Sequence, residues 1–334
     1  MIANATVTSP GQMTPRRRDG IPSRALHRYA VCVAVCTALL VFAGGLVTST
    51  GAGLSVPDWP LSYGMVFPPM VGNVLYEHGH RMIATTVGLM TIVLAIWLQR
   101  REARPRVRRL GWLALAAVVL QGVLGGITVL LMLPPEVSIA HACLGQTFFC
   151  IVVAIALLTS PSWQAAPPPC PLAGNGTTRA LAVASAAAVF LQLVLGALMR
   201  HTGAGLAIPD YPLAFGRLVP QFTTLGIAVH FAHRTFALVV AACIAATTIR
   251  ILRHQSAQPE LWQPAILLLG LVLTQIALGA FTIWSAKAVV PTTLHVLGGA
   301  LILATSLVLA MRSFHLLSVE GARRNAVLSQ AVTS

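Results

Sequence analysis

The sequence carries very little charge for its length. Only 9% of its 334 residues are Asp, Glu, Lys or Arg, and 56% are hydrophobic. Ordinary soluble domains have roughly 25% charged residues, so this composition excludes an ordinary soluble protein. We therefore expect an integral membrane protein, whose helices are surrounded by lipid rather than by water.

Acidic residues are the scarcest charged class. Eight of them stand against 22 basic residues, which gives a net charge of +14. Such a balance is found in nucleic-acid-binding proteins, but here the arginines lie in short segments between apolar runs, and no aromatic-basic RNA motif accompanies them. The arginines therefore indicate membrane orientation, and no nucleic-acid partner is expected.

Cysteine is also scarce, and the positions of the cysteines argue against disulfide bonds and metal binding. None of the six forms a CxxC pair or part of an even set in an outside loop; they are Cys32, Cys36, Cys143, Cys150, Cys170 and Cys243. We expect neither a disulfide nor a zinc site. Most of these side chains should behave as small buried hydrophobes.

Long apolar runs account for most of the chain. Each is close to the ~20 residues that cross the hydrocarbon core of a bilayer. Eight are present, at 30–49, 79–98, 110–131, 138–159, 180–200, 230–250, 263–284 and 290–311. The predicted fold class is an all-α integral membrane protein with eight transmembrane helices.

The distribution of arginine predicts how the chain faces the membrane. Residues 1–29 hold five arginines and residues 99–109 hold six. Because basic segments stay on the cytoplasmic side, we expect both termini to be cytoplasmic and the loops 50–76 and 201–229 to face outward. A mitochondrial presequence has a similar composition, but no long amphipathic stretch is present. The expected location is the bacterial cytoplasmic (inner) membrane.

The chain contains an internal repeat. Segment 50–64 matches segment 202–216 at a constant offset of 152 residues, through Thr-Gly-Ala-Gly-Leu and Pro-Asp-aromatic-Pro-Leu. Because each copy contains four helices, an even number, the copies should be parallel, as two pseudo-symmetric four-helix bundles. The predicted parts are a basic tail 1–29, an N-terminal half 30–159, a Pro-rich linker 160–179, a C-terminal half 180–312 and a tail 313–334.

Four histidines occupy matching places in the two halves. They stand near the outer ends of the second, fourth, sixth and eighth runs and are His80, His141, His233 and His295. Ionisable groups inside a membrane cost roughly 2.5–3.5 kcal/mol each, so they persist where they have a partner or a function. Two histidines from different helices at one depth are what bis-imidazole ligation of haem iron requires. A single histidine would more simply hydrogen-bond a neighbouring helix, but four in register predict haem ligation in both halves.

Small residues follow three of these histidines at helical spacing. These residues lie on the same helix face as their histidine, and they are Ala84, Gly145, Gly298 and Gly299. Residues three and four positions apart lie on one side of a helix. We expect these small side chains to leave room for the edge of a porphyrin.

Charged neighbours of the histidines suggest further roles. Arg81 and Arg234 directly follow two of them and are expected to pair with haem propionates, although an arginine at a helix end can also simply snorkel. Glu77 lies one turn before His80, at the place where the second half has His230. A carboxylate there can anchor a substrate, accept a proton or attack a carbocation. The alternative is a solvated loop carboxylate.

Two further features have simpler expected roles. His78 aligns with Phe231 in the other half and is expected to be spare. The Pro-Asp-aromatic-Pro-Leu segments 57–61 and 209–213 should form ordered turns. These turns either cover the two expected haem pockets or have a purely structural role.

At these residues the sequence resembles the haem A synthase family. The resemblance rests on Gly-Leu-Ser-x-Pro-Asp-Trp-Pro-Leu at 53–61, on Glu-x-x-His-Arg at 77–81 and on the helices that carry His141 and His295. It covers residues 27–312. It implies an enzyme that oxidises a ring methyl of haem O to a formyl group by successive hydroxylations, which gives haem A for terminal oxidases.

The resemblance also implies which half does what. A haem b would be held by His233 and His295, and the substrate haem would lie between His80 and His141, with Glu77 catalytic. The expected partners are haem O, haem O synthase, an electron donor of open identity, the lipid bilayer and a second copy of the chain. Many bacterial members carry a cysteine pair in the first outward loop, where this chain has Val56 and Ser62. Electrons must therefore reach this protein without such a pair.

Two other function classes remain open from the sequence. A di-haem b-type electron-transfer cytochrome would need the four histidines but not Glu77. A parallel-repeat transporter would not need paired histidines at one depth.

Overall fold

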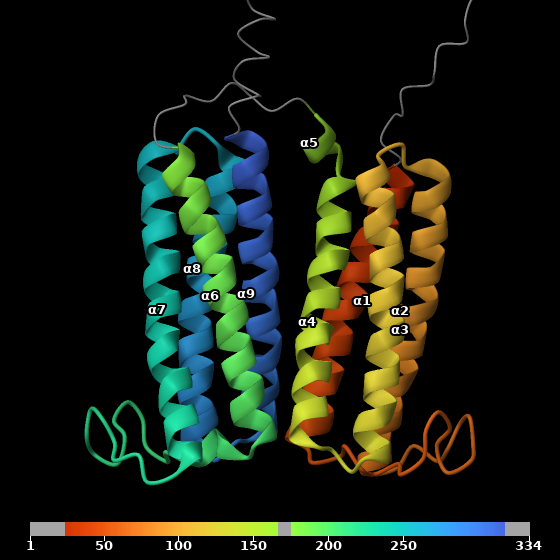
Figure 1. The fold of residues 1–334 in the computed structure, drawn as a ribbon, viewed down its shortest axis with the longest axis vertical. Coiled ribbons are helices and arrows are strands. Elements are labelled where there is room, and N and C mark those ends of the chain that lie inside the picture. Colours follow the sequence, from red (N-terminus) through yellow and green to blue (C-terminus); the bar gives the residue numbers. More distant parts are fainter. Residues whose placement is uncertain (1–23, 166–174, 318–334) are drawn as a thin grey trace, which may run out of the picture.

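The computed structural model describes residues 24–165 and 175–317, and Figure 1 shows their arrangement. The first four long helices are α1 (Arg24–Ser49), α2 (Asn73–Arg101), α3 (Pro105–Leu130) and α4 (Pro135–Leu158). The other four are α6 (Asn175–His201), α7 (Leu225–His254), α8 (Pro259–Trp284) and α9 (Val289–Leu316). Two short pieces are α5 (Pro161–Gln164) and the 3-10 turn η1 (Ala204–Leu206).

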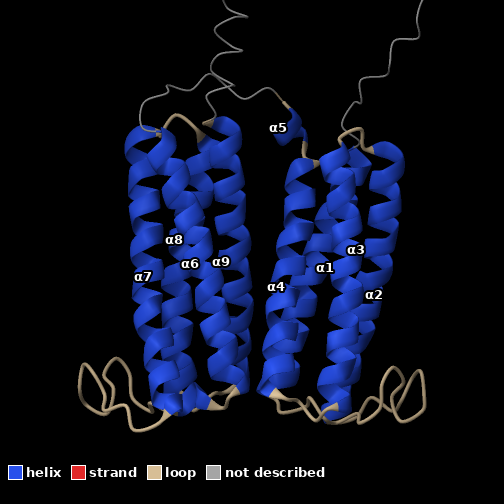
Figure 2. Cartoon of the chain, viewed as in Figure 1, coloured by secondary structure: helices blue, strands red, loops and turns tan. Residues whose placement is uncertain are grey.

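All eight long helices are apolar and long enough to cross a membrane. Figure 2 draws only helices and loops over the described ranges, and no strand occurs there. The predicted all-α membrane fold with eight spanning helices is confirmed. The helices extend beyond the apolar stretches, because the helical backbone hydrogen bonds continue into residues that lie outside the lipid. Thus α2 begins at Asn73, six residues before the expected span, and Glu77 lies inside the helix.

Local sequence explains several helix ends. Proline stands in the first turn of α3, α4 and α8, where its missing N–H costs nothing. The α7 helix begins at a Thr224 cap, whose hydroxyl accepts from the Ile227 N–H at 3.3 Å. Arg100 and Arg101 close α2, where the helix dipole favours positive charge.

The long helices form two groups of four, which lie side by side in Figure 1. In the first group α1 and α3 each contact α2 and α4; in the second, α6 and α8 each contact α7 and α9. Each group surrounds its own apolar cluster, centred on Leu94, Leu98 and Phe148 in one and on Ile244, Leu261 and Leu268 in the other. The symmetry axis that we expect between the groups remains a prediction.

The two groups meet through α1, α4, α6 and α9. Near the end that carries the long loops, the Arg200 guanidinium on α6 donates to the Gly45 carbonyl at 3.1 Å and to the Ser49 hydroxyl at 3.0 Å, both on α1. The Thr293 hydroxyl on α9 donates to the same Ser49 oxygen at 3.0 Å. Three helices from both groups are therefore joined at one polar point.

Some expectations fall outside the described ranges or concern cysteine. The tails 1–23 and 318–334, the linker part 166–174 and Cys170 within it lie outside the described residues. The five cysteines that are described are free thiols, and the expectation that most are buried is wrong, because Cys32 is exposed and the other four are half-buried.

Candidate functional site

The four histidines come together as two pairs, one in each helix group. His233 of α7 and His295 of α9 have ring centroids 6.4 Å apart, with the ring planes at 66°. His80 of α2 and His141 of α4 lie close enough to interact electrostatically. Each pair joins two diagonal helices of its group, at the end of the molecule where the long loops emerge.

The spacing of the C-terminal pair fits a metal held between two imidazoles. Bonds of about 2 Å from one metal to a nitrogen of each ring place the ring centroids roughly 6 Å apart. The observed 6.4 Å agrees with this value. Among the described residues, no group of three or more His, Cys, Asp or Glu could hold a bare metal ion. A haem needs only axial ligands from the protein, because the macrocycle supplies the others.

A glycine of the preceding helix lies against each histidine ring. A Cβ added at these positions would lie 3.0–3.2 Å from the ring Cε1 atom; the pairs are Gly44 with His80, Gly125 with His141, Gly196 with His233 and Gly279 with His295. Contacts this short are tighter than real side chains normally make. The glycines therefore let each ring lie against the neighbouring helix backbone, and together they make the histidine positions equivalent in the two halves.

Three glutamines also hold the histidines, and sequence reasoning missed them. The side-chain amide of each donates to the main-chain carbonyl of one histidine: Gln121 to His141 at 2.9 Å, Gln192 to His233 at 2.9 Å and Gln275 to His295 at 2.7 Å. Each stands four residues before the glycine under the same ring. The repeat could have revealed these positions, because Gln121 and Gln275 share the offset of His141 and His295.

The expected room beside the small residues is absent at the three glycines. The Gln121 amide nitrogen lies 3.0 Å from a Cβ added at Gly145, and Leu193 Cδ2 lies 2.8 Å from one added at Gly299. The Gln275 side chain lies still closer to Gly298. That expectation is wrong, because side chains from the neighbouring helices already fill the space.

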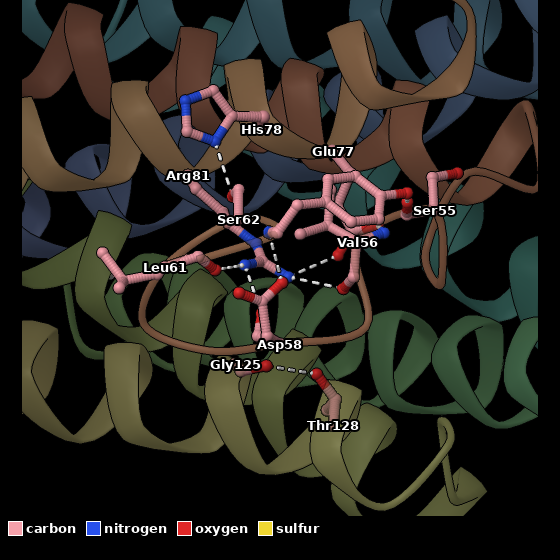
Figure 3. A network of polar contacts seen from close by, with 11 residues as sticks. Ser55, Val56, Asp58, Leu61, Ser62, Glu77, His78, Arg81, Gly125 and Thr128 are labelled. Carbon is pink, nitrogen blue, oxygen red and sulfur yellow. Dashed lines mark hydrogen bonds and ion pairs between the residues drawn. The ribbon is translucent and has the colours of Figure 1, made fainter. Parts of the chain in front are cut away.

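Glu77 is not a solvated loop carboxylate. It is only 4% exposed, and it is the only Asp or Glu that is buried in the described part of the chain. Its Oε2 accepts from the Val56 N–H at 2.9 Å, and its Oε1 pairs with Arg81 Nη2 at 2.7 Å (Figure 3). A buried carboxylate is therefore held in one orientation next to the His80 turn of α2.

Arg81 fastens the first outward loop onto α2. Its guanidinium donates to the carbonyls of Asp58 at 2.7 Å, Leu61 at 2.9 Å and Val56 at 3.0 Å, as Figure 3 shows. His78 adds a second tie, because its Nδ1 lies 2.8 Å from the Ser62 hydroxyl. That His78 takes no part in ligation stays a prediction, but its ring, which has no counterpart in the repeat, has a partner in the loop.

The second half repeats this arrangement without the carboxylate. His230 Nδ1 takes the place of the Glu77 oxygen and accepts from the Ile208 N–H at 3.2 Å. Arg234 donates to the Asp210 carbonyl at 2.7 Å and stacks over the Tyr211 ring at 4.9 Å. Its Nη1 is buried and has no hydrogen-bond partner. Because His230 is a neutral acceptor and does not pair with Arg234, the Nη1 donor of Arg234 is free to bind an anion.

Both outward loops form the ordered turns that the sequence predicts. The Asp58 carboxylate accepts from the N–H groups of Tyr63 at 2.7 Å and Gly64 at 2.8 Å, and Asp210 makes the same two bonds in its loop. Gly64 has a φ of 71°, a conformation that glycine adopts without strain. Hydrogen bonds from the Gly64 and Tyr63 N–H groups lower the pKa of Asp58, which keeps the carboxylate ionised.

Trp59 places the first loop over the histidine site. Its ring lies against Gly126 of α3, the residue next to the glycine under His141. In the second loop Tyr211 packs edge-on against Trp284 at the end of α8, with 6.0 Å between ring centroids. Each loop thus covers the end of the helix that backs one histidine of its half.

Comparison with known proteins agrees with this architecture. The chain matches the family model for COX15-CtaA, described as cytochrome oxidase assembly protein, over residues 27–73 and 70–307. It is 30% identical over 270 residues to the heme A synthase of Geobacillus kaustophilus, across 78% of this chain and 83% of that protein. It is 29% identical over 340 residues to the heme A synthase of a Caulobacter species, across 87% and 96% of the two chains. The chain therefore belongs to the COX15-CtaA family of cytochrome oxidase assembly proteins.

Proposed function

We propose that this protein acts as a haem A synthase, a membrane oxidoreductase that converts haem O to haem A. The observation that carries the proposal is the glycine-backed histidine pair in each half of a chain from this family. Relatives that cover most of the chain are named heme A synthase. Oxidation of a ring methyl to a formyl group removes four electrons from the substrate, so an oxidant and an electron route from outside this chain are required.

The C-terminal half, residues 180–312, would hold a resident haem b. His233 and His295 would be its axial ligands, which their 6.4 Å ring spacing supports. The free, buried Nη1 of Arg234 would pair with a propionate. When bound, a haem with two histidine ligands supplies electron transfer at this site.

The N-terminal half, residues 30–159, would bind the substrate haem between His80 and His141. Glu77 would be the catalytic carboxylate, because it is buried and its orientation is fixed by Arg81 and Val56. Oxidation of the methyl carbon releases protons, and a Glu77 oxygen can accept one at this place. We also assign Arg81 to the propionates, although its four donor contacts to Glu77 and the loop make Arg234 the better-supported cation.

The chain would lie in the bacterial cytoplasmic membrane with both termini in the cytoplasm. The long loops 50–72 and 202–224 leave from one end of the molecule in Figure 1, and the arginine-rich connection between α2 and α3 lies at the other. Residues 160–179 would be the cytoplasmic linker between the halves. Haem O synthase would supply the substrate, and copies of the chain would associate.

Pigment analysis after expression with a haem O supply tests the proposed function. Haems extracted from the membranes and separated by chromatography should include haem A. A strain that makes haem O but lacks the protein is the control. If only haem O and haem b are recovered, the enzyme reading is wrong and a di-haem cytochrome is favoured.

A further inference from the structure

One arginine lies at the junction between the two helix groups. Arg200 stands in the last turn of α6, and its Nη2 donates to the Gly45 carbonyl and to the Ser49 hydroxyl of α1. Among the described residues, no carboxylate forms an ion pair with this guanidinium. Arg200 therefore brings a positive charge without a negative partner into the space between the halves.

The junction lies between the two histidine sites, because two neighbouring glycines of α1 each contact one of them. Gly44 lies against the His80 ring, with 3.0 Å between an added Cβ and the ring Cε1. Gly45 faces α9 instead, where an added Cβ would lie 3.3 Å from Thr293 Cγ2 and 3.6 Å from Val296 Cβ. Those two residues stand on either side of the α9 histidine. The arginine is therefore bound to a backbone carbonyl that lies between the two sites.

The charge acts mainly on the C-terminal site. The Thr293 hydroxyl donates at 3.0 Å to the same Ser49 oxygen that accepts from Arg200, and Thr293 stands two residues before His295. Arg200 is close enough to His295 to interact with it electrostatically. Within the described part of the chain, no such interaction joins Arg200 to His80.

The N-terminal half has no equivalent cation. At the repeat offset of 152 residues, Thr48 corresponds to Arg200. The arginine beside the N-terminal site, Arg81, is paired with Glu77 at 2.7 Å, so a negative charge opposes its own. The two sites therefore differ in their electrostatic surroundings: a positive charge is added beside the C-terminal pair and balanced beside the N-terminal pair.

A nearby positive charge favours the ferrous form of a haem, because reduction by one electron makes the iron less positive. Water and salt screen such an effect less at a partly buried place than at the surface. We propose that Arg200 raises the reduction potential of the haem bound by His233 and His295, so that this haem accepts an electron more readily from a reductant outside the chain. The inference rests on the proposed function, and Arg200 acts in it as a positioning residue that touches no reacting atom.

Redox titration of the purified full-length protein tests this inference. The protein is taken from cells that make no haem O, and the low-spin haem spectrum is followed against the applied potential. Arg200→Gln keeps an amide donor at this place but removes the charge, so the ratio of ferrous to ferric haem at a fixed potential should fall roughly tenfold. Arg200→Lys keeps the charge and should stay close to wild type.

A matched control removes a positive charge from the same half without touching the junction. Arg217 is exposed in the second outward loop, where water screens its charge, so Arg217→Gln should leave the potential unchanged. A purely structural role, in which Arg200 only ties the halves together, would not make the potential follow the charge. An unchanged potential in Arg200→Gln, or an equal fall in Arg200→Lys, would overturn the inference.

A second variant carries the test if Arg200→Gln loses its low-spin spectrum. Ser49→Asp leaves Arg200 in place and sets a carboxylate beside its guanidinium, so the ferrous fraction should fall as it does without the charge. Ser49→Asn is the uncharged control and should resemble wild type. An equal potential in these two variants would contradict the inference. Absence of low-spin haem from wild type would instead remove the proposed function.

Discussion

Glu77 and Arg81 stand one turn apart on α2, and the 2.7 Å ion pair between them is buried beneath the first outward loop. The second half keeps the arginine as Arg234 and replaces the carboxylate with His230, which makes the same bond to the loop backbone. Holding the loop therefore needs an acceptor at this place but not a negative charge. The charge of Glu77 is what the N-terminal half has in addition.

Substitution of Glu77 should separate loop anchoring from chemistry. Glu77→Gln keeps an oxygen for the Val56 N–H but removes the charge, so the protein should fold and keep haem b. Haem A should fall to background in extracted pigments. Glu77→Ala should lose haem A as well. Normal haem A in cells that carry the Gln variant would favour the electron-transfer cytochrome or a structural role for Glu77.

Removal of either C-terminal histidine should abolish the bound haem b. His233→Ala or His295→Ala leaves one axial ligand where the 6.4 Å pair had two. Absorption spectra of the purified variants should lose the low-spin signal. A full low-spin haem b spectrum in either variant would contradict the ligand assignment, whatever the activity.

The glycines that lie against the histidine rings should tolerate no side chain. Gly125→Ala places a methyl 3.0 Å from the His141 ring and should displace it, with loss of haem from the N-terminal half. Gly122→Ala, one turn earlier on α3, meets nothing within 4 Å and is the matched control. Alanine is the better helix former by roughly 1 kcal/mol, so the control should be as stable as wild type or more. Equal haem content in the two variants would show that the glycine contact is dispensable.

The first loop should loosen in acid. Hydrogen bonds from Gly64 and Tyr63 hold the Asp58 pKa below its ordinary value of about 3.9. A lowered pKa means that the stabilisation is present above that ordinary value and is lost as the pH falls through the lower, folded-state value. Limited proteolysis of residues 53–65 should therefore accelerate below about pH 4. Asp58→Asn should already show fast cleavage at neutral pH, and an unchanged rate in that variant would contradict the role of the carboxylate.

Much of the architecture is readable from the order of residues. Apolar runs near the thickness of a bilayer predict helices, because a chain in lipid has to satisfy its backbone internally. The repeat then singles out His80, His141, His233 and His295 from the ten histidines of the chain, without any knowledge of contacts. Asp58 and its copy in the second loop are likewise predictable as turn residues, since their bonds are local.

Contacts between helices were not readable in this way. Gly145 and Gly298 share a face with their histidines, and this local spacing predicted open room, but glutamines from α3 and α8 fill it. The partner of a side chain on a neighbouring helix depends on how the two helices pack. No sequence spacing along one helix encodes that packing.

The sequence by itself determined the membrane class, the eight helices and the pairing of histidines between halves, because hydropathy and repetition act along the chain. Only the tertiary structure decided what surrounds each histidine: a glycine beneath every ring and a glutamine amide on three of them. It also turned Glu77 from a residue of uncertain exposure into a buried anion with two fixed partners. Those features arise where separate helices and a loop meet. Burial at such places increases the energetic importance of a single charge or hydrogen bond.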